Sequence, residues 1–537
     1  MSPIKKITLL FIMQFSFFNN ILCDFASELE DFTDDKAALQ KKDSDSPANC
    51  AETKNVDVLG ILLTANVASI LAECDIYQKT SGVNKRPITT LPIFNLYHLE
   101  HACQDLVLKF NLFGNVCTKE FYTDDHPHLR SYLTIQTPCI IDKLEKSFLT
   151  KDFLPQIIKI SDLVGRIKLE ERRVGLMTQI FKNYKHCSLE FDIPFFYQER
   201  NIRPTEAEEY DLKEALTPAG GDIDSKQIEK EFKKHVISDK IGFGDMRIRL
   251  AFPFIHDSNF CAKLGIQTTL PTTFCLKKGL MGSDFRENLH TPKIDLRLLT
   301  CLAQQAFIMK DIAAQEELIA LLKPIGFDAL DRFGAMVLDS PLGNHRHFTA
   351  GVFFEPRIRL HEGVTLFANL SYEYIFPHVE KRFFLKIKNL DLEKFKKDVE
   401  DNNEEAATKD MRQLNQALIE TLFPNLYQTD IFPKNSLQCT IGTNFRIREW
   451  DFNFGYDVWW QQKEKIGSTC GINPCKNLKI EKSENVGSLQ NKLFGSFGYN
   501  QIKKDYDWSL SLFAEDAIAT TGIGKDFTIA GRFEINF

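Results

Sequence analysis

The sequence predicts an all-β membrane protein, an antiparallel transmembrane β-barrel of about 14 strands, with about 12 as the alternative. Three observations support this fold class. The C-terminus is a long amphipathic strand, similar strands recur upstream with alternately short and long links, and the N-terminus has the pattern of an export signal. The longest links also carry helical patterns, so we expect helical insertions in long external loops.

The C-terminal strand has apolar residues at every second position. Phe527, Ile529, Phe533, Ile535 and Phe537 alternate with polar or small residues that include Arg532 and Glu534. A period of two over this length predicts a strand with one apolar face and one polar face. Such a strand, ending the chain on an aromatic residue, is typical of a barrel in a membrane.

Similar alternation occurs upstream and predicts thirteen further strands. The stronger ones are Arg172–Lys182, Cys187–Gln198, Gly242–Ile255, Asn259–Thr272, His347–Leu360, Val364–Phe376, Leu437–Ile447, Glu449–Lys463, Leu493–Ile502 and Asp507–Ala517. Weaker patterns cover Arg86–Tyr97, Asp105–Val116 and His128–Gln136. Because a closed barrel with both ends on one side needs an even number of strands, we expect about 14 or about 12.

Short and long links alternate along the chain. The short ones are Tyr184–His186, His256–Ser258, His361–Gly363, Arg448 and Lys503–Tyr506. The long ones are 137–171, 199–241, 273–346, 377–435, 464–492 and 518–525. Outer-membrane barrels have short periplasmic turns and long external loops, so this parity predicts a periplasmic C-terminus.

The N-terminus predicts export. Lys5 and Lys6 precede the apolar run Ile7–Phe18, which is too short to span a membrane as a helix, so we expect residues 1–23 to be a cleaved signal peptide. Lipidation at Cys23 is the alternative, although Leu22 and its neighbours lack the small residues such a site needs. We expect residues 24–86 to form a periplasmic leader or a plug in the lumen, and residues 87–537 to form the barrel.

Composition excludes some functions. The formal net charge is −7, with a pI near 6.0, which gives no reason to expect a nucleic-acid partner. No segment after the signal has 18 apolar residues without charges, so the sequence predicts no membrane-spanning helix. Helical spacing within the long links predicts helices at 206–215, 225–234, 294–309, 316–322 and 409–423.

The polar faces of the predicted strands carry many charges, which we expect to line the lumen. Their simplest role is to form cross-strand ion pairs, and the functional alternative is solute selection. The predicted lumen-lining residues are Arg247, Arg249, Lys263, Glu355, Arg357, Arg359, Glu373, Arg446, Asp451, Asp457, Glu515, Arg532 and Glu534.

The sequence does not predict an enzyme, a metal site or a cofactor. His345 and His347 lie near Asp339 and Ser340, which is the one cluster with residue types suited to hydrolysis, but its spacing is unspecific. Cys470 and Cys475 flank a Gly/Pro turn and are a disulfide candidate. A lone Cys-x4-Cys pair is poor evidence for a metal site. Cys261 and Cys439 fall in predicted strands, where we expect them to be inert.

Two segments resemble a known family. Ile241–Leu250 contains Gly-Asp-x-Arg-x-x-Leu, and Gly265–Pro271 ends the next strand in a proline-containing loop. This pattern resembles outer-membrane transporters of the long-chain fatty-acid and aromatic-hydrocarbon (FadL-like) family. The resemblance implies a barrel of 14 strands, an N-terminal plug and passage of small hydrophobic molecules. The chain departs from that pattern in its long loops 273–346 and 377–435.

We therefore expect a barrel in the bacterial outer membrane that acts as a channel or transporter for small solutes, with hydrophobic molecules among the candidates. The alternatives are a surface-display barrel, whose long loops bind a host or partner macromolecule, and a soluble secreted β-protein. The expected partners are outer-membrane lipid, the solute and the barrel-assembly machinery, for which Phe537 would be the recognition signal. The sequence does not predict an oligomeric state.

Overall fold

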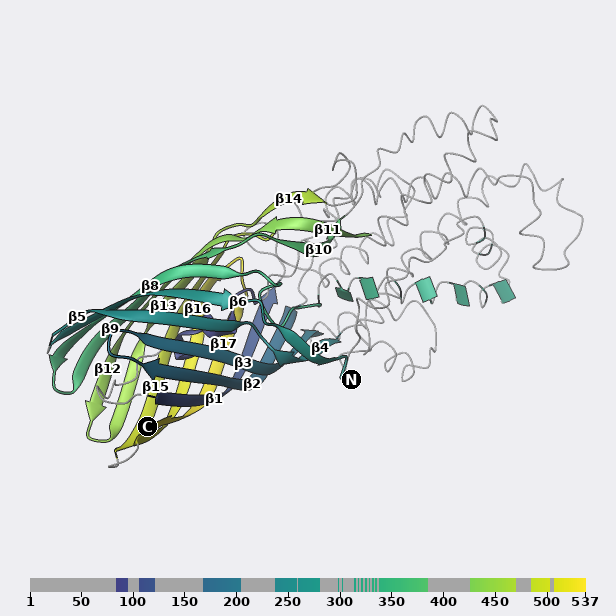
Figure 1. The fold of residues 1–537 in the computed structure, drawn as a ribbon. Helices are drawn as coiled ribbons and strands as arrows, with labels where there is room; N and C mark the ends of the chain where they lie inside the picture. The colour runs from purple at the N-terminus through teal and green to yellow at the C-terminus, as the bar shows by residue number, and fades with distance from the viewer. Residues whose placement is uncertain are drawn as a thin grey trace, which may run out of the picture.

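The computed structural model describes residues 84–94, 106–120, 168–203, 237–257, 259–280, scattered positions between 298 and 335, and residues 338–384, 425–469, 484–502 and 507–537. Within these ranges the protein is a closed antiparallel β-barrel, shown in Figure 1. Its first strand pairs with its last, and that pairing closes the sheet.

Twelve strands form the barrel, and each is hydrogen-bonded to the next barrel strand along the chain. They are β1 (Leu106–Glu120), β2 (Lys168–Asn183), β3 (Ser188–Arg203), β5 (Met246–His256), β6 (Phe260–Leu270), β8 (Thr349–His361), β9 (Val364–Ile375), β12 (Lys434–Ile447), β13 (Trp450–Gln461), β15 (Ser488–Ile502), β16 (Asp507–Thr521) and β17 (Lys525–Asn536).

The expected number of about 14 strands is wrong for the barrel, and the alternative of about 12 is confirmed. The sheet has two further strands, β4 (Ile237–Phe243) and β7 (Phe274–Lys278), which extend from β3 off the barrel. The predicted strand Arg86–Tyr97 is also wrong over its described part, where two 3-10 turns replace it. The predicted strand His128–Gln136 lies outside the described residues.

Two ends of the barrel differ in their connections. Short turns join β2 to β3, β5 to β6, β8 to β9, β12 to β13 and β15 to β16, and we call this the turn end. The opposite end, which we call the loop end, has the long connections. The C-terminus lies at the turn end in Figure 1, where the Phe537 N–H donates to Leu106 O at 3.0 Å. The predicted parity of short and long links is therefore present.

One loop-end link is short, contrary to the predicted long link 518–525. β16 continues to Thr521 and β17 begins at Lys525, so only three residues join them. Gly522 makes this turn possible, because its φ is +68° and a Cβ there would lie 2.1 Å from the Gly487 carbonyl oxygen. The link is tight because the strand pattern of β16 extends beyond Ala517.

The outward face of the wall is apolar. On β16, Leu510 and Leu512 are exposed while Phe513 and Glu515 on the other face are buried. The same alternation runs along β17, where Phe527, Ile529 and Phe533 point outward; Val352, Leu370, Ile441, Phe454 and Leu493 are exposed on other strands. Soluble monomers rarely expose such a continuous apolar belt, whereas barrels in lipid require one.

A second sheet stands beyond the loop end. It consists of β10 (His378–Phe384), β11 (Asn425–Phe432) and β14 (Lys465–Thr469), and it extends away from the barrel in Figure 1. Phe384, Ile431 and Ile466 form its small buried core. Lys434, at the junction of β11 and β12, has a φ of 65° and turns the chain from this sheet into the wall.

The helical loop insertions stay a prediction. Leu298 and Leu302 are helical in the structure, but no helix between 298 and 335 has bounds among the described residues. The described part of the chain contains no helix long and apolar enough to cross a membrane.

A lipid-facing position can be tested with a charge. We expect Leu512→Arg, on an outward side chain that is 56% exposed, to lower the free energy of unfolding in lipid by about 2–4 kcal/mol. The matched change Leu360→Arg, at a 60% exposed side chain near the turn end, should cost about 0–1 kcal/mol. Urea unfolding in lipid vesicles measures both. Equal costs at the two depths would contradict a membrane-embedded wall.

Candidate functional site in the barrel lumen

A short piece of chain fills part of the barrel interior. Asn84–Phe94, which we call the lumenal segment, contains two 3-10 turns, η2 (Ile88–Thr90) and η3 (Pro92–Phe94). Polar contacts from several barrel strands hold its backbone. Gln438 donates to Thr90 O at 3.0 Å, Arg532 donates to Ile93 O at 2.6 Å, and Gln179 donates to Phe94 O at 3.1 Å.

The side chain of Arg86 anchors the lumenal segment to the wall. Its guanidinium lies 2.7 Å from the Asp457 carboxylate, and both side chains are fully buried. The same group donates to Gln490 at 3.2 Å and to Thr90 O at 2.6 Å. A buried charge that lost its partner would cost several kcal/mol, so this pair fixes the position of the segment.

An apolar cluster surrounds the segment on its other sides. Ile88, Leu91, Ile93 and Phe94 are buried against wall residues that face the lumen. Phe94 and Phe113 meet edge to face, with ring centroids 5.5 Å apart. The wall partners are Phe113, Met177, Phe196, Phe367, Phe494, Phe513 and Ala530, with Leu342 from a loop. The interior at this depth is therefore a packed core.

The charged residues that the sequence predicts for the lumen differ in burial. Arg247, Arg249, Glu373, Asp457, Glu515, Arg532 and Glu534 are buried, whereas Lys263, Glu355, Arg357, Arg446 and Asp451 are partly buried and Arg359 is exposed. Whether any of them selects a solute stays a prediction.

Many of these charges form ion pairs within the wall. Arg247 pairs with Asp192 at 2.7 Å, and Arg249 bridges Glu190 at 3.0 Å and Glu355 at 2.6 Å. In the low-dielectric interior a buried charge needs such a partner. The pairs of Arg247 with Asp192 and of Arg249 with Glu190 connect the adjacent strands β5 and β3, as expected for charges that fix the register of the wall. The pair of Arg249 with Glu355 reaches past β6 to β8.

The sequence interpretation missed several charges at the centre of the lumen. Lys492 is fully buried and binds Glu515 at 2.7 Å and Asp526 at 2.6 Å. Glu515 also accepts the Ile93 N–H at 3.2 Å, which links this cluster to the lumenal segment. Extending the alternation of β15 by one residue would have found Lys492, and the polar face of the last strand already included Asp526. Arg86 had no such signal.

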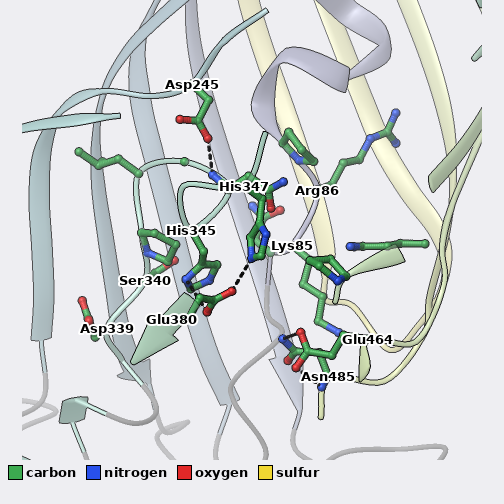
Figure 2. A pocket seen from close by; sticks show the side chains of 18 of the residues that line it. Lys85, Arg86, Asp245, Asp339, Ser340, His345, His347, Glu380, Glu464 and Asn485 are labelled. Carbon is green, nitrogen blue, oxygen red and sulfur yellow. Dashed lines mark hydrogen bonds and ion pairs between the residues drawn. The ribbon is translucent and has the colours of Figure 1, made fainter. Parts of the chain in front are cut away.

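A cavity of about 150 Å³ lies on the loop-end side of the lumenal segment, shown in Figure 2. The lumenal segment forms its floor with Lys85, Arg86 and Ile88. Its polar and charged lining comes from several connections as well as from the wall. These other lining residues include Arg173, Arg200, Asp245, Asp339, Ser340, Asn344, His345, His347, Glu380, Arg382, Glu464 and Asn485.

One loop bends into this cavity. We call Leu338–His347 the mouth loop; its Leu342 is buried in the apolar cluster of the lumen. Asp245 holds the loop, because it accepts the Asn344 N–H and the Thr273 hydroxyl, each at 2.5 Å. Burial raises the pKa of Asp245, although these hydrogen bonds act in the opposite direction.

A histidine and a chain of ion pairs connect the mouth loop to the outer sheet. The His347 ring lies 2.6 Å from Glu380 and 2.8 Å from Phe376 O. Arg382 then bridges Glu380 at 2.9 Å and Glu464 at 3.3 Å. Burial alone would raise the pKa of Glu380, but Arg382, His345 and His347 together hold this pKa well below its usual range.

The structure does not assemble a hydrolytic site from Asp339, Ser340, His345 and His347. The Ser340 hydroxyl accepts hydrogen bonds from Gln198 at 2.6 Å and Arg200 at 2.8 Å, and Asp339 pairs with Lys240. Both ring nitrogens of His347 have other partners. A nucleophile needs a base within hydrogen-bond reach, and His347 is bonded elsewhere.

The other predictions from the sequence concern the cysteine pair, metal binding and the C-terminal Phe537. Cys470 and Cys475 lie outside the described residues, so their disulfide stays a prediction. Among the described residues, no group of three His, Cys, Asp or Glu side chains could hold a metal ion. Phe537 is exposed at the turn end, and its role in assembly also stays a prediction.

Comparison with known proteins assigns no family to the chain. No family model and no curated protein matches the chain. Among solved structures, the toluene transporter TodX of Pseudomonas putida is 8% identical, covers 87% of this chain and 97% of its own, and has a TM-score of 0.29. A FadL homologue of Pseudomonas aeruginosa is 6% identical over 81% and 90%, with a TM-score of 0.25.

The transport unit of the autotransporter AIDA-I from Escherichia coli is 7% identical over 88% of this chain and 98% of its own, with a TM-score of 0.31. The hydrocarbon channels that the sequence resembles are thus among the structures found. Likenesses at this level do not assign the chain to a family, and the barrel fold rests on its own strand pairing.

The low pKa of Glu380 predicts a pH dependence. A carboxylate with a depressed pKa stabilises the fold above its unfolded pKa of about 4.3, and this stabilisation is lost as the pH falls below that value. We expect the wild-type protein to lose stability in acid and Glu380→Gln to lose less. Thermal unfolding between about pH 6 and about pH 3 measures the difference. An equal loss in both proteins would contradict this role for Glu380.

Proposed function

We propose that this protein is an outer-membrane barrel that transports small polar solutes, and that the lumenal segment closes its pathway. The observation that carries the proposal is the interior itself. A charged and hydrogen-bonded wall surrounds a separate piece of chain, and that piece is attached through a few defined polar contacts. Removal of the segment would leave a channel lined by these polar and charged groups together with the apolar wall residues that now pack against the segment.

The apolar outward belt supports the membrane setting. Leu510, Leu512, Phe527 and Ile529 are large and exposed, and they lie on the adjacent strands β16 and β17. Pairing of β1 with β17 closes the barrel wall and leaves it without an unpaired strand edge. Such an edge would expose unsatisfied backbone groups to lipid. This argument is independent of the comparisons.

The lining of the cavity supports a polar solute. Guanidinium groups of Arg173 and Arg200, carboxylates of Asp245 and Glu380, and the amide of Asn344 all line it. These residues supply both hydrogen-bond donors and acceptors to the lining of the cavity. A hydrophobic solute would leave such groups unsatisfied.

Opening requires only that the lumenal segment moves. Strand pairing and the Arg247–Asp192 and Arg249–Glu190 ion pairs hold the wall without the segment. The segment itself depends on the Arg86–Asp457 pair and its backbone contacts. A change that weakens this attachment should therefore open the lumen and leave the barrel intact.

Planar-bilayer conductance of Arg86→Ala tests the proposal. We expect wild-type protein to show almost no conductance. The variant should spend roughly tenfold more time in the open state, because a shift of about 1.4 kcal/mol changes the ratio of open to closed molecules tenfold. The control is Arg446→Ala, a partly buried arginine whose Nε donates to Arg448 O near the turn end. The control should behave as wild type.

Each outcome has a meaning for the proposal. An Arg86→Ala barrel that folds, as shown by its heat-dependent electrophoretic shift, yet stays silent would contradict closure by the segment. Swelling of vesicles that contain the variant identifies the solute class. Entry of small sugars or amino acids supports a polar pathway, whereas exclusion of these with uptake of toluene would overturn it.

One feature favours surface display as a second function. The β10–β11–β14 sheet extends beyond the barrel and holds the ends of the 385–424 connection in register, since Phe384 pairs with Asn425. A rigid support of this kind suits a loop that binds a partner. Replacing 385–424 with an Asn-Gly turn preserves the hairpin. Lost cell adhesion with unchanged permeability would support display, and unchanged adhesion would contradict it.

A further inference from the structure

The lumenal segment runs from the loop end toward the turn end of the barrel, and this direction bears on where the residues before Asn84 lie. We propose that the chain enters the lumen from the loop end, so that the residues before Asn84 lie on the side of the long loops, opposite to Phe537. In an outer membrane, the N-terminal region would be displayed outside the cell. The statement that this region lies outside the cell rests on the proposed outer-membrane location, whereas its position on the loop side does not.

The first residues of the segment contact the loop end of the wall. Lys85 Nζ donates to Val486 O at 2.8 Å and lies 3.4 Å from the Ser488 hydroxyl. Val486 belongs to the long connection before β15, and Ser488 is the loop-end start of that strand. Asn84 donates to Asn115, in the loop-end half of β1.

The last residues of the segment lie deeper. Ile93 contacts Glu515 and Arg532, in the middle of β16 and β17. Phe94 O accepts from Gln179, close to the turn end of β2. The next described residue is Leu106, which starts β1 at the turn end. The described residues therefore run from the loop end at Asn84 toward the turn end at Phe94, and β1 starts at the turn end with Leu106.

A second pass of the chain through the same lumen would meet a filled interior. Arg86, Ile93, Phe113 and Phe513 are among the most completely buried side chains, and Arg532 stacks on Phe513 at 4.4 Å. Protein interiors at this density have no space for another strand. The residues before Asn84 therefore cannot return to the turn end beside the segment, and they stay on the loop side. This differs from the expected periplasmic leader.

Three epitope insertions in the full-length protein test the proposal. One is placed between Asp45 and Ser46, one between Gly279 and Leu280 at the loop end, and one between Glu362 and Gly363 in a turn. Antibody binding is compared in intact and permeabilised cells. We expect the Asp45 epitope to behave as the Gly279 epitope does. If it instead behaves as the Glu362 epitope does, the proposal is overturned.

This comparison separates the two proposals. If the barrel has the opposite orientation in the membrane, the first two epitopes become inaccessible together, so the inference stands while surface display fails. If the protein is soluble, lysine cross-linking of the purified chain tests on which side of the barrel the N-terminal residues lie. Cross-links from Lys41, Lys42 or Lys54 to Lys381 support the inference, and cross-links to Lys503 overturn it.

Discussion

Pairing between β1 and β17 is the constraint on which the rest of the structure depends. It joins Leu108 to Ile535 and Phe110 to Phe533 in register, and it converts an open sheet into a closed wall. In a closed wall every strand is hydrogen-bonded to a neighbour on each side. No backbone polar group is then left exposed at an edge, so the outer face can be wholly apolar. Because side chains alternate, the same closure directs charges such as Arg532 and Glu515 into the interior.

The interior then has to satisfy those charges. Part of the solution is within the wall, as in the Lys492 cluster with Glu515 and Asp526. The other part is the lumenal segment, which supplies Arg86 for Asp457 and the Ile93 backbone for Glu515 and Arg532. Structure and proposed function therefore depend on the same contacts, since the groups that stabilise the closed lumen are those that a permeating solute would meet.

The wall was predictable from the sequence and the lumenal segment was not. A period of two defines β16 and β17 because lipid and lumen impose opposite polarity on alternate residues, and link parity defined the two ends. Arg86–Tyr97 was interpreted as a strand because Ile88, Leu91 and Ile93 are apolar, but these residues are buried on all sides. Periodicity cannot identify a segment that the tertiary structure surrounds, and this error also raised the strand count. The contact of His347 with Glu380 had no local signal, because Glu380 lies in the predicted link 377–435, outside every predicted strand.

The native thiol of Cys117 tests the occupied lumen most directly. Cys117 lies on the inner face of β1 and is fully buried. In membranes that contain the wild-type protein, a water-soluble methanethiosulfonate reagent should leave Cys117 unmodified in peptide mass spectrometry, and unfolding should make it reactive. Rapid modification of Cys117 in the folded, membrane-inserted protein would show a water-filled lumen and would contradict a pathway closed by Asn84–Phe94.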